Sequence, residues 1–559
     1  MHRRRRRSTS HSVGEKDRSS PSVPPTNRHR CLILCFDGTD NQFGADNSNV
    51  VQLVSALKKD DCTKQMVYYQ TGIGTYTSPR FATPMSAKIS QVRDISGRSA
   101  HGAYPLIQTV DAAIAWNLDS HVMSGYEFLM QNYTANDRIC IFGFSRGAYI
   151  ARSLAGMIHK VGLLPVDNYQ QVPFAYRMYA RTDATGWAQS NAFKKAFSND
   201  VHIDFLGVWD TVDSVGLIRR RLPFTASNTI VRTFRHAVSL DERRAKFQVN
   251  LWNMPHGDSS MGKLKEKLKH RKRSAPGQTQ SEKLTERLTD KLPALPLPKA
   301  FRRSSTDSSE ETEIKNEEAY ALDHARDHKT RPTDVLEVWF AGCHGDVGGG
   351  AVPNETPHSL ARIPLRWMIR ETFKAGTGML YDPTRLRELG LDPDTLYPEV
   401  RARPAPLPAQ GRTIESIPKK KSWFHRLFSR APDSDVLPEN SKRVSVSEEE
   451  EELYDSLAPI YDGLKLEPLW WILELIPMRF RHQRSDWTWE SNYYANLGRP
   501  RRIPHQRPAE EDPNHYEDSK PSVTLKVHRS VETRRMARDA KGRAYVNRAR
   551  FRCEPEWVD

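Results

Sequence analysis

The sequence predicts an α/β fold: a mostly parallel β-sheet with helices on both faces, interrupted by long disordered insertions. Two observations predict it. Short apolar runs rich in β-branched and aromatic residues alternate with segments of helical periodicity, as in sheets built from strand–helix–strand units. Only 38% of the 559 residues are hydrophobic, and 36 are proline. This composition favours one sizeable core with polar insertions over several compact domains.

Shifts in composition predict the domain boundaries. We expect residues 1–28 to be a disordered, basic N-terminus, because they are rich in Arg, Ser and Pro. Residues 29–401 should form the main domain, interrupted by a flexible Lys/Ser/Pro/Glu-rich insertion at 255–332. A low-complexity linker follows at 402–452. The aromatic and basic segment 453–559 should pack on the main domain.

Local patterns then predict the elements of the main domain. Strands are expected at 31–36, 66–70, 138–142, 201–209 and 335–340, and those at 31–36 and 138–142 should be buried. Helices are expected at 49–57, 103–131 and 364–373, with mixed helical character at 235–247. The alternation of the two kinds of segment is the reason to expect parallel strands joined by helices.

The pentapeptide Gly143-Phe-Ser-Arg-Gly147 lies between a predicted strand and a predicted helix. A Gly-x-Ser-x-Gly sequence at such a turn is typical of a nucleophile elbow, in which the serine is held in a strained conformation. Gly143 and Gly147 fit there because a side chain at either position would collide with the neighbouring strand or helix. The pattern therefore predicts that Ser145 is a catalytic nucleophile.

A serine nucleophile needs a base, and the base needs an acid that orients it. In an α/β-hydrolase these residues follow the serine in the order acid, then histidine, each at the end of a strand. Asp210 ends the predicted strand 201–209, and His344 follows the strand 335–340. The predicted triad is Ser145, Asp210 and His344, in an α/β-hydrolase-like catalytic domain.

Other residues compete for these roles. Asp213 lies three residues beyond Asp210 and is an alternative acid. His236 and His528 are the alternative histidines. Asp346 is too close to His344 in sequence to be its preferred partner, so we expect it to cap a turn or bind a cation.

The oxyanion hole should use the backbone N–H of Arg146, the residue after the nucleophile. The second donor should come from Gly38 or Thr39, because an early buried strand is expected beside the elbow strand. Asp37 has two further interpretations: a helix cap, or part of a phosphatase motif that needs an aspartate nucleophile two residues earlier. Position 35 is a cysteine, which argues against the phosphatase.

Several motifs together resemble a known family. They are Phe36-Asp-Gly-Thr39, Gly143-Phe-Ser-Arg-Gly-Ala-Tyr149, Val208-Trp-Asp-Thr-Val212, Arg235-His-Ala237 with Asp241-Glu-Arg-Arg244, and His344-Gly-Asp-Val-Gly-Gly-Gly350. This combination is similar to the uncharacterised α/β-hydrolase domain shared with the type VI secretion phospholipase effectors, in its fungal form. The resemblance covers about residues 29–375 and implies serine-dependent hydrolysis of phospholipid esters by Ser145, Asp210 and His344. The alternative function is a non-catalytic α/β-hydrolase-like scaffold that binds partners or anionic membranes.

The formal charge of +16 is concentrated in basic runs. One of them, 419–430, interleaves cations with aromatic residues and predicts peripheral contact with an anionic membrane; a docking helix or a basic linker is the alternative. No nucleic-acid module is recognisable, so no specific nucleic-acid partner is expected. The substrate should be a lipid or another ester, and the motifs imply no metal or cofactor.

The six cysteines form no Cys-x-x-Cys pair, as expected for reduced thiols of an intracellular protein. No secretory signal or membrane-spanning run is recognisable, which predicts a cytoplasmic location.

Overall fold

The computed structural model describes residues 21–39, 41–72, 103–212, 221–253, 316–317, 320, 332–417, 447–483, 489–503, 524–551 and 554–559. Their central feature is an eight-stranded sheet in which all neighbouring strands run parallel. Its strands are β1 (Cys31–Phe36), β2 (Gln65–Gln70), β3 (Arg138–Phe144), β4 (Ile203–Trp209), β5 (Val231–Ser239), β6 (Asp334–Phe340), β9 (Lys526–His528) and β10 (Glu556–Val558). A separate antiparallel pair consists of β7 (Met478–Gln483) and β8 (Trp489–Tyr494).

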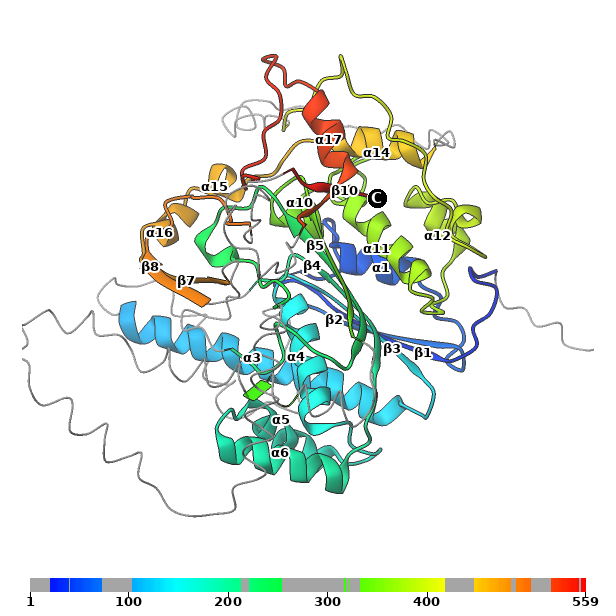
Figure 1. The fold of residues 1–559 in the computed structure, drawn as a ribbon, viewed down its shortest axis with the longest axis vertical. Helices are drawn as coiled ribbons and strands as arrows, with labels where there is room; N and C mark the ends of the chain where they lie inside the picture. Colours follow the sequence, from blue (N-terminus) through cyan, green and yellow to red (C-terminus); the bar gives the residue numbers. More distant parts are fainter. Residues whose placement is uncertain are drawn as a thin grey trace, which may run out of the picture.

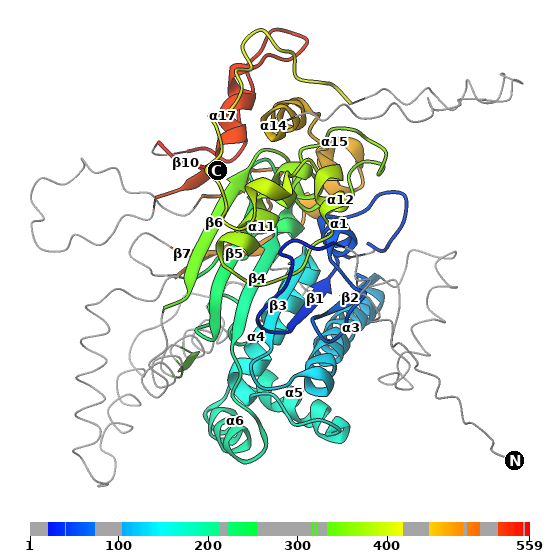
Figure 2. The same ribbon diagram turned by 90° about the vertical axis from the view of Figure 1, so that its right-hand side faces the viewer.

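Helices cover both faces of the sheet. One face carries α3 (Ala103–Asn132), α4 (Arg146–Val161), α5 (Val172–Ala180) and α6 (Ala184–Phe197), and the other carries α1 (Asn49–Ala56), α11 (Arg362–Lys374) and α12 (Pro383–Glu388). Figures 1 and 2 show the two layers on opposite sides of the strands. The predicted α/β fold is thereby confirmed. Among the described helices, none is both long enough and apolar enough to cross a bilayer.

The strands form two cores because successive side chains point to opposite faces of a sheet. In β1, Leu32 and Leu34 pack with the α3 and α4 side chains. Ile33 and Cys35 instead pack with the α1 and α11 side chains. A strand that is buried on both faces is apolar at nearly every position, which is why these runs are recognisable in the sequence.

The strand order is β10-β9-β6-β5-β4-β3-β1-β2. Strands β2 and β3 are the two neighbours of β1 within the sheet. From β1 the chain passes first to β2 and then crosses to β3 on the opposite side of β1. Loops that leave the carboxyl ends of β1 and β3 therefore diverge, and such a switch point is where open α/β sheets place their ligands. Ser145 directly follows β3 at this switch point.

The structure corrects one predicted element. The segment 235–247, which we expected to have mixed helical character, begins inside strand β5, and only its end, Ala245–Phe247, forms a 3₁₀ turn. The strand is central and buried, yet it carries Arg235 and His236. Arg235 is paired with Glu371 (Nε–Oε2 2.6 Å), and His236 with Glu337 (Nδ1–Oε1 2.8 Å). These polar residues hide the apolar pattern of a strand.

Parts of the predicted disordered segments are ordered. Val23, placed in the N-terminal tail, exchanges backbone hydrogen bonds with Tyr381. Glu317, placed in the insertion at 255–332, pairs with Arg221 (2.9 Å), and Tyr320 packs against Trp187. In each case a few residues bind a partner in the main domain, through the backbone at Val23 and through side chains at Glu317 and Tyr320. Composition averaged over a segment does not reveal such contacts.

The acidic run that we placed at the end of the linker belongs to a helix. Helix α14 (Glu448–Leu457) begins there with Ser447 as its cap, so the predicted boundary at 452 cuts through it. Its glutamates are held by arginines: Arg370 pairs with Glu448 and Arg403 with Glu452. Helix α17 (Arg529–Met536) packs beside α14, and β9 pairs with β6, so the C-terminal segment extends the central sheet.

Candidate active site

Ser145 lies in a strained turn between β3 and α4. Its backbone angles are φ 59° and ψ −123°, in a region that residues other than glycine seldom adopt. The turn is tied to the next strand by a hydrogen bond from the Ser145 N–H to the Trp209 carbonyl (3.0 Å). Strain of this kind persists only where the surrounding structure imposes it, and it occurs often at functional sites.

Two glycines make this turn possible. A Cβ atom on Gly147 would overlap the backbone carbonyl oxygens of Phe36 and Asp37 at the end of β1. A Cβ atom on Gly143 would lie 2.5 Å from the Gly147 carbonyl oxygen and 2.7 Å from the Ala148 Cα. The close approach seats the first turn of α4 directly on the loop that follows β1.

The structure brings Asp210 and His344 into contact. Asp210 follows β4, and His344 begins the short helix α10 (His344–Gly348) after β6. The His344 Nδ1 and the Asp210 Oδ2 lie 2.5 Å apart, and both residues are buried. The imidazole ring lies 4.7 Å, between ring centroids, from both Phe144 and Phe247. With Nδ1 engaged by the carboxylate, Nε2 is the nitrogen left for proton transfer.

The backbone around His344 is held by the adjoining acidic pair. Asp241 Oδ2 accepts from the Gly342 N–H (2.7 Å), and Glu242 Oε2 accepts from the His344 N–H (3.2 Å). Arg244 pairs with Glu242 (2.8 Å) and lies 3.6 Å from the ring centroid of Phe247. Burial would raise the pKa of Glu242, but Arg244, together with the charges of Arg501 and His344, lowers it to about 2. The ionised Glu242 thus holds the backbone of the loop between β6 and α10, which carries His344 (the histidine loop).

Buried charges also set the ionisation of the Asp210–His344 pair. Burial alone would raise the pKa of Asp210, but the charges of Arg501 and His344 and their hydrogen bonds hold it well below its usual range. Burial lowers the pKa of His344, and the bond to Asp210 only partly offsets this. The pair therefore combines an ionised carboxylate with a neutral imidazole, the state that a general base requires.

Arg501 is the residue that the sequence analysis missed. Its guanidinium donates to both Asp210 oxygens, from Nη1 to Oδ1 (2.6 Å) and from Nη2 to Oδ2 (2.9 Å). It follows β8 within a basic, proline-containing stretch that no motif distinguishes. Only its burial beside Asp210 identifies it.

Ser145 and His344 lie at the same edge of the sheet but share no hydrogen bond in the described part of the chain. Phe144 connects them, since it precedes Ser145 in the chain and its ring contacts the imidazole. Catalytic hydrogen bonds often tighten only when a substrate is bound.

The loop after β1 lies beside the elbow, where we expect an oxyanion hole. Arg146 is the first residue of α4. The Gly38 N–H donates to Asp37 Oδ1 (2.7 Å), and the other Asp37 oxygen accepts from Tyr69 (2.8 Å). Asp37 therefore braces this loop, while α1 is capped by a different residue. The Thr39 hydroxyl is buried and has no hydrogen-bond partner in the described chain.

The alternative histidines have other partners. Both His236 nitrogens are engaged, Nδ1 by Glu337 (2.8 Å) and Nε2 by the Thr211 N–H (3.1 Å). His528 pairs with Ser530 (2.8 Å) and stacks on Phe340, and burial lowers its pKa to about 4.

Asp346 closes a turn, one of the two roles expected of it. Its Oδ2 accepts from the backbone N–H groups of Cys343 (2.8 Å) and Tyr461 (3.0 Å), and burial raises its pKa to about 7. Asp213 and the predicted membrane-binding segment 419–430 lie outside the described residues.

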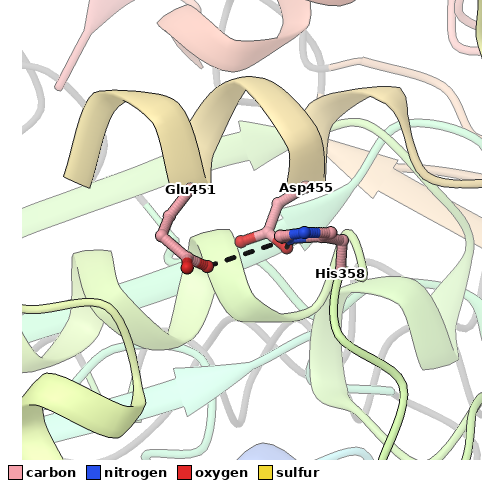
Figure 3. Close-up of side chains that lie close together, drawn as sticks. All are labelled: His358, Glu451 and Asp455. Atoms are coloured by element: carbon pink, nitrogen blue, oxygen red, sulfur yellow. Dashed lines mark ion pairs between the residues drawn. The ribbon is translucent and has the colours of Figure 1, made fainter. Parts of the chain in front are cut away.

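Within the described ranges, two side-chain groups have the composition of a metal site. In the first, the His358 ring lies below α14, with Nδ1 3.8 Å from Glu451 Oε2 and 3.6 Å from Asp455 Oδ1 (Figure 3). Arg362 already pairs with Glu451 and Arg366 with Asp455, both at 2.7 Å.

The second group comprises Glu452, His528 and Asp559. Arg403 and Arg529 pair with Glu452, and Arg403 also pairs with Asp559. Cations of the chain thus compensate these carboxylates.

Comparisons with known proteins identify the family of this chain. A family model described as the catalytic domain of the Tle1-like phospholipase effectors of type VI secretion matches residues 30–371. The chain is 30% identical to the uncharacterized protein YEL023C of Saccharomyces cerevisiae, over 87% of this chain and 79% of that protein.

Two solved structures were also found. One is an uncharacterized protein from Pseudomonas aeruginosa, 17% identical, with a TM-score of 0.30, covering 65% of this chain. The other is the Tle1 effector bound to the VgrG spike, 18% identical, with a TM-score of 0.22, covering 42% of this chain. The match spans about half, 49%, of each of those chains.

Proposed function

The chain belongs to the family of Tle1-like type VI secretion phospholipase effector catalytic domains, and from this premise we propose that it is a serine hydrolase that cleaves lipid carboxylic esters. One observation carries the proposal. The Asp210–His344 pair, joined at 2.5 Å, lies at the same sheet edge as Ser145, whose backbone is held at φ 59°. A base with a fixed tautomer beside a strained serine is suited to acyl transfer.

In the proposed reaction, Ser145 Oγ attacks the ester carbonyl carbon while His344 Nε2 takes the hydroxyl proton. The tetrahedral intermediate collapses, and the alcohol leaves with that proton. An acyl-enzyme remains on Ser145. Water, deprotonated by His344, then attacks this ester. The acid leaves as His344 returns the proton to Ser145 Oγ. Asp210 holds the tautomer of His344 and stabilises its charged form in both steps.

The negative oxygen of the intermediate would face the start of α4 and the loop after β1. The positive end of the helix dipole favours an anion at the Arg146 N–H. Because the Gly38 N–H is already bound to Asp37, we assign the second donor to Thr39. Its buried hydroxyl has no hydrogen-bond partner in the described chain, so it is available to donate to the oxygen that becomes negative in acyl transfer.

An exposed apolar surface beside the site favours a lipid substrate over a soluble ester. Helix α16 (Trp470–Glu474) and its flanks expose Leu469 (77%), Ile472 (60%) and Leu475 (64%). We call these three residues the α16 apolar surface. Trp470 packs on Phe247 (ring centroids 5.4 Å), which in turn contacts His344. Exposed apolar patches of this kind mark sites of contact with proteins or membranes.

The α16 apolar surface is rigidly mounted. Glu474 is fully buried and accepts from three groups: the Ala245 N–H (2.6 Å), the Asn496 amide (2.7 Å) and the Gly498 N–H (2.9 Å). The nearby residues Lys465 and Arg499 are exposed, as is Glu467, so these three residues add a net positive charge. An apolar surface with basic flanks is complementary to an anionic lipid surface.

The nucleophile is tested with a fluorophosphonate probe, which reacts with activated serines. We expect the full chain to be labelled and Ser145→Ala to lose labelling and turnover, because no other group supplies the attacking oxygen. Ser55→Ala, an exposed serine of α1, is the matched control and should label like the natural chain. Equal labelling of the Ser145→Ala variant would reject Ser145 as the nucleophile. No labelling of the natural chain would point instead to a non-catalytic scaffold.

The lipid assignment is tested by comparing a soluble short-chain ester with vesicles that contain an anionic phospholipid. The double variant Leu469→Asp/Ile472→Asp should lose about tenfold or more in vesicle turnover and keep its turnover of the soluble ester. Val166→Asp, at an exposed apolar position on another part of the fold (56%), is the control. Unchanged vesicle turnover in the double variant would contradict the assignment.

A further inference from the structure

Arg501 makes a bidentate ion pair with the carboxylate that orients His344. Its side chain is 1% exposed, and its Nη1 and Nη2 reach the two oxygens of Asp210 at 2.6 and 2.9 Å. A planar guanidinium that meets both oxygens fixes the plane of the carboxylate as well as its position. The Asp210 oxygen that contacts His344 is therefore fixed from the opposite side.

Arg501 is itself held by fixed backbone and side-chain groups. Nη1 donates to Ser239 Oγ (2.7 Å), and Nε donates to the Phe247 carbonyl oxygen (2.9 Å). Ser239 ends β5 and also donates its N–H to Asp210 Oδ1 (2.9 Å). Phe247 contacts the imidazole ring of His344. The guanidinium thus contacts the acid and the residue that packs on the base.

We propose that Arg501 is a positioning residue of the active site. It fixes Asp210 against His344, and its positive charge partly offsets the negative charge of Asp210 at the imidazole. The inference rests on the proposed function. Arg501 lies outside residues 30–371, the range of the family model, so the C-terminal segment completes the site that the catalytic domain begins.

The charge of Arg501 has a definite effect on the base. Asp210 stabilises the protonated form of His344, and a cation bound to the far side of Asp210 weakens this stabilisation. With Arg501 present, the imidazole stays neutral to a lower pH than it would beside a lone carboxylate. Glu242 and Arg244 also act on the pKa of His344. Arg501 lowers the pKa of Glu242 as well, so Glu242 stays ionised in the natural chain.

The test is the pH profile of kcat/KM on a soluble ester for the full chain and for Arg501→Met and Arg501→Lys. In Arg501→Met the acid limb should move up by about one pH unit, because an opposing charge is removed. In Arg501→Lys the limb should stay near that of the natural chain, while kcat falls on the order of tenfold because the bidentate geometry is lost. Arg502→Met, at the exposed neighbouring position, is the control and should match the natural chain.

A merely structural Arg501 would lower activity in both variants without moving the acid limb, and that result would overturn the proposal. If Arg501→Met does not fold, Arg501→Lys decides alone, and a kcat equal to that of the natural chain would overturn it. A natural chain without Ser145-dependent turnover would overturn the proposed function as well. An active natural chain with an unchanged limb in Arg501→Met would overturn only the role of Arg501.

Discussion

The two sides of the site are built by different physical means. On the side of Ser145, the backbone sets the geometry: a strained φ, two glycines, and helix α4 seated on the end of β1. On the side of His344, buried charges set it: Asp210 between His344 and Arg501, with Glu242 holding the loop. The first side depends on the space between backbone atoms, and the second depends on charge balance. Substitutions should therefore affect the two sides differently.

The largest effect should follow from removing the charge of Asp210. In Asp210→Asn the amide cannot stabilise protonated His344, and one of its N–H groups would face either Arg501 or the imidazole. We expect kcat to fall about 10⁴-fold with the fold retained. Steady-state kinetics, with circular dichroism to confirm folding, provides the measurement. A loss smaller than tenfold would show that Asp210 does not act on the base.

The backbone side is tested with Gly147→Ala. The added Cβ would overlap the carbonyl oxygens of Phe36 and Asp37, so the elbow must shift. We expect a loss of activity of about 100-fold and a loss of about 1–3 kcal/mol in the free energy of unfolding. Gly44→Ala is the matched control, since its nearest neighbouring atom would be 3.8 Å away. Similar behaviour of the two variants would contradict the close packing of the elbow.

Thr39→Val removes one hydroxyl from the backbone side and nearly preserves its shape. If Thr39 Oγ1 is the second oxyanion donor, kcat should fall about a hundredfold with little change in KM. Thr39→Ser restores the donor and should recover most of the activity. Loss of activity in the Ser variant as well would assign the effect to packing of the threonine methyl group.

The smallest effect concerns pH. Burial lowers the pKa of His344, so the neutral base persists below pH 6.5, the usual value for histidine. Activity should therefore be retained from neutral pH down to that value and fall tenfold per unit once the pH drops through the lowered pKa. A profile of kcat/KM on a soluble ester measures this. An acid limb above pH 6.5 would indicate that the pKa of His344 is set by Asp210, which raises it, rather than by burial, which lowers it.

The same contrast explains what the sequence could predict. The backbone side is local: Gly143, Ser145 and Gly147 are adjacent in the chain, and glycine is needed where atoms approach closely. Strands buried on both faces were also recognisable from their apolar runs, and the predicted parallel sheet is confirmed.

The charged side could be predicted only in part. Asp210 and His344 were found because each follows an apolar strand. Strand β5 was missed because Arg235 and His236 are buried with partners distant in the chain. Arg501 carries no local signal, since its partner lies 291 residues away. Buried ion pairs between distant segments follow no periodic pattern, so only the folded chain reveals them.

The late position of Arg501 in the chain has a consequence for biosynthesis. A ribosome completes residues 30–371 well before it adds residue 501, and N-terminal regions generally fold first. A nascent polypeptide would therefore carry the elbow and the histidine loop while Asp210 still lacks its guanidinium. If Arg501 has the proposed positioning role, the complete site would therefore arise only near the end of translation.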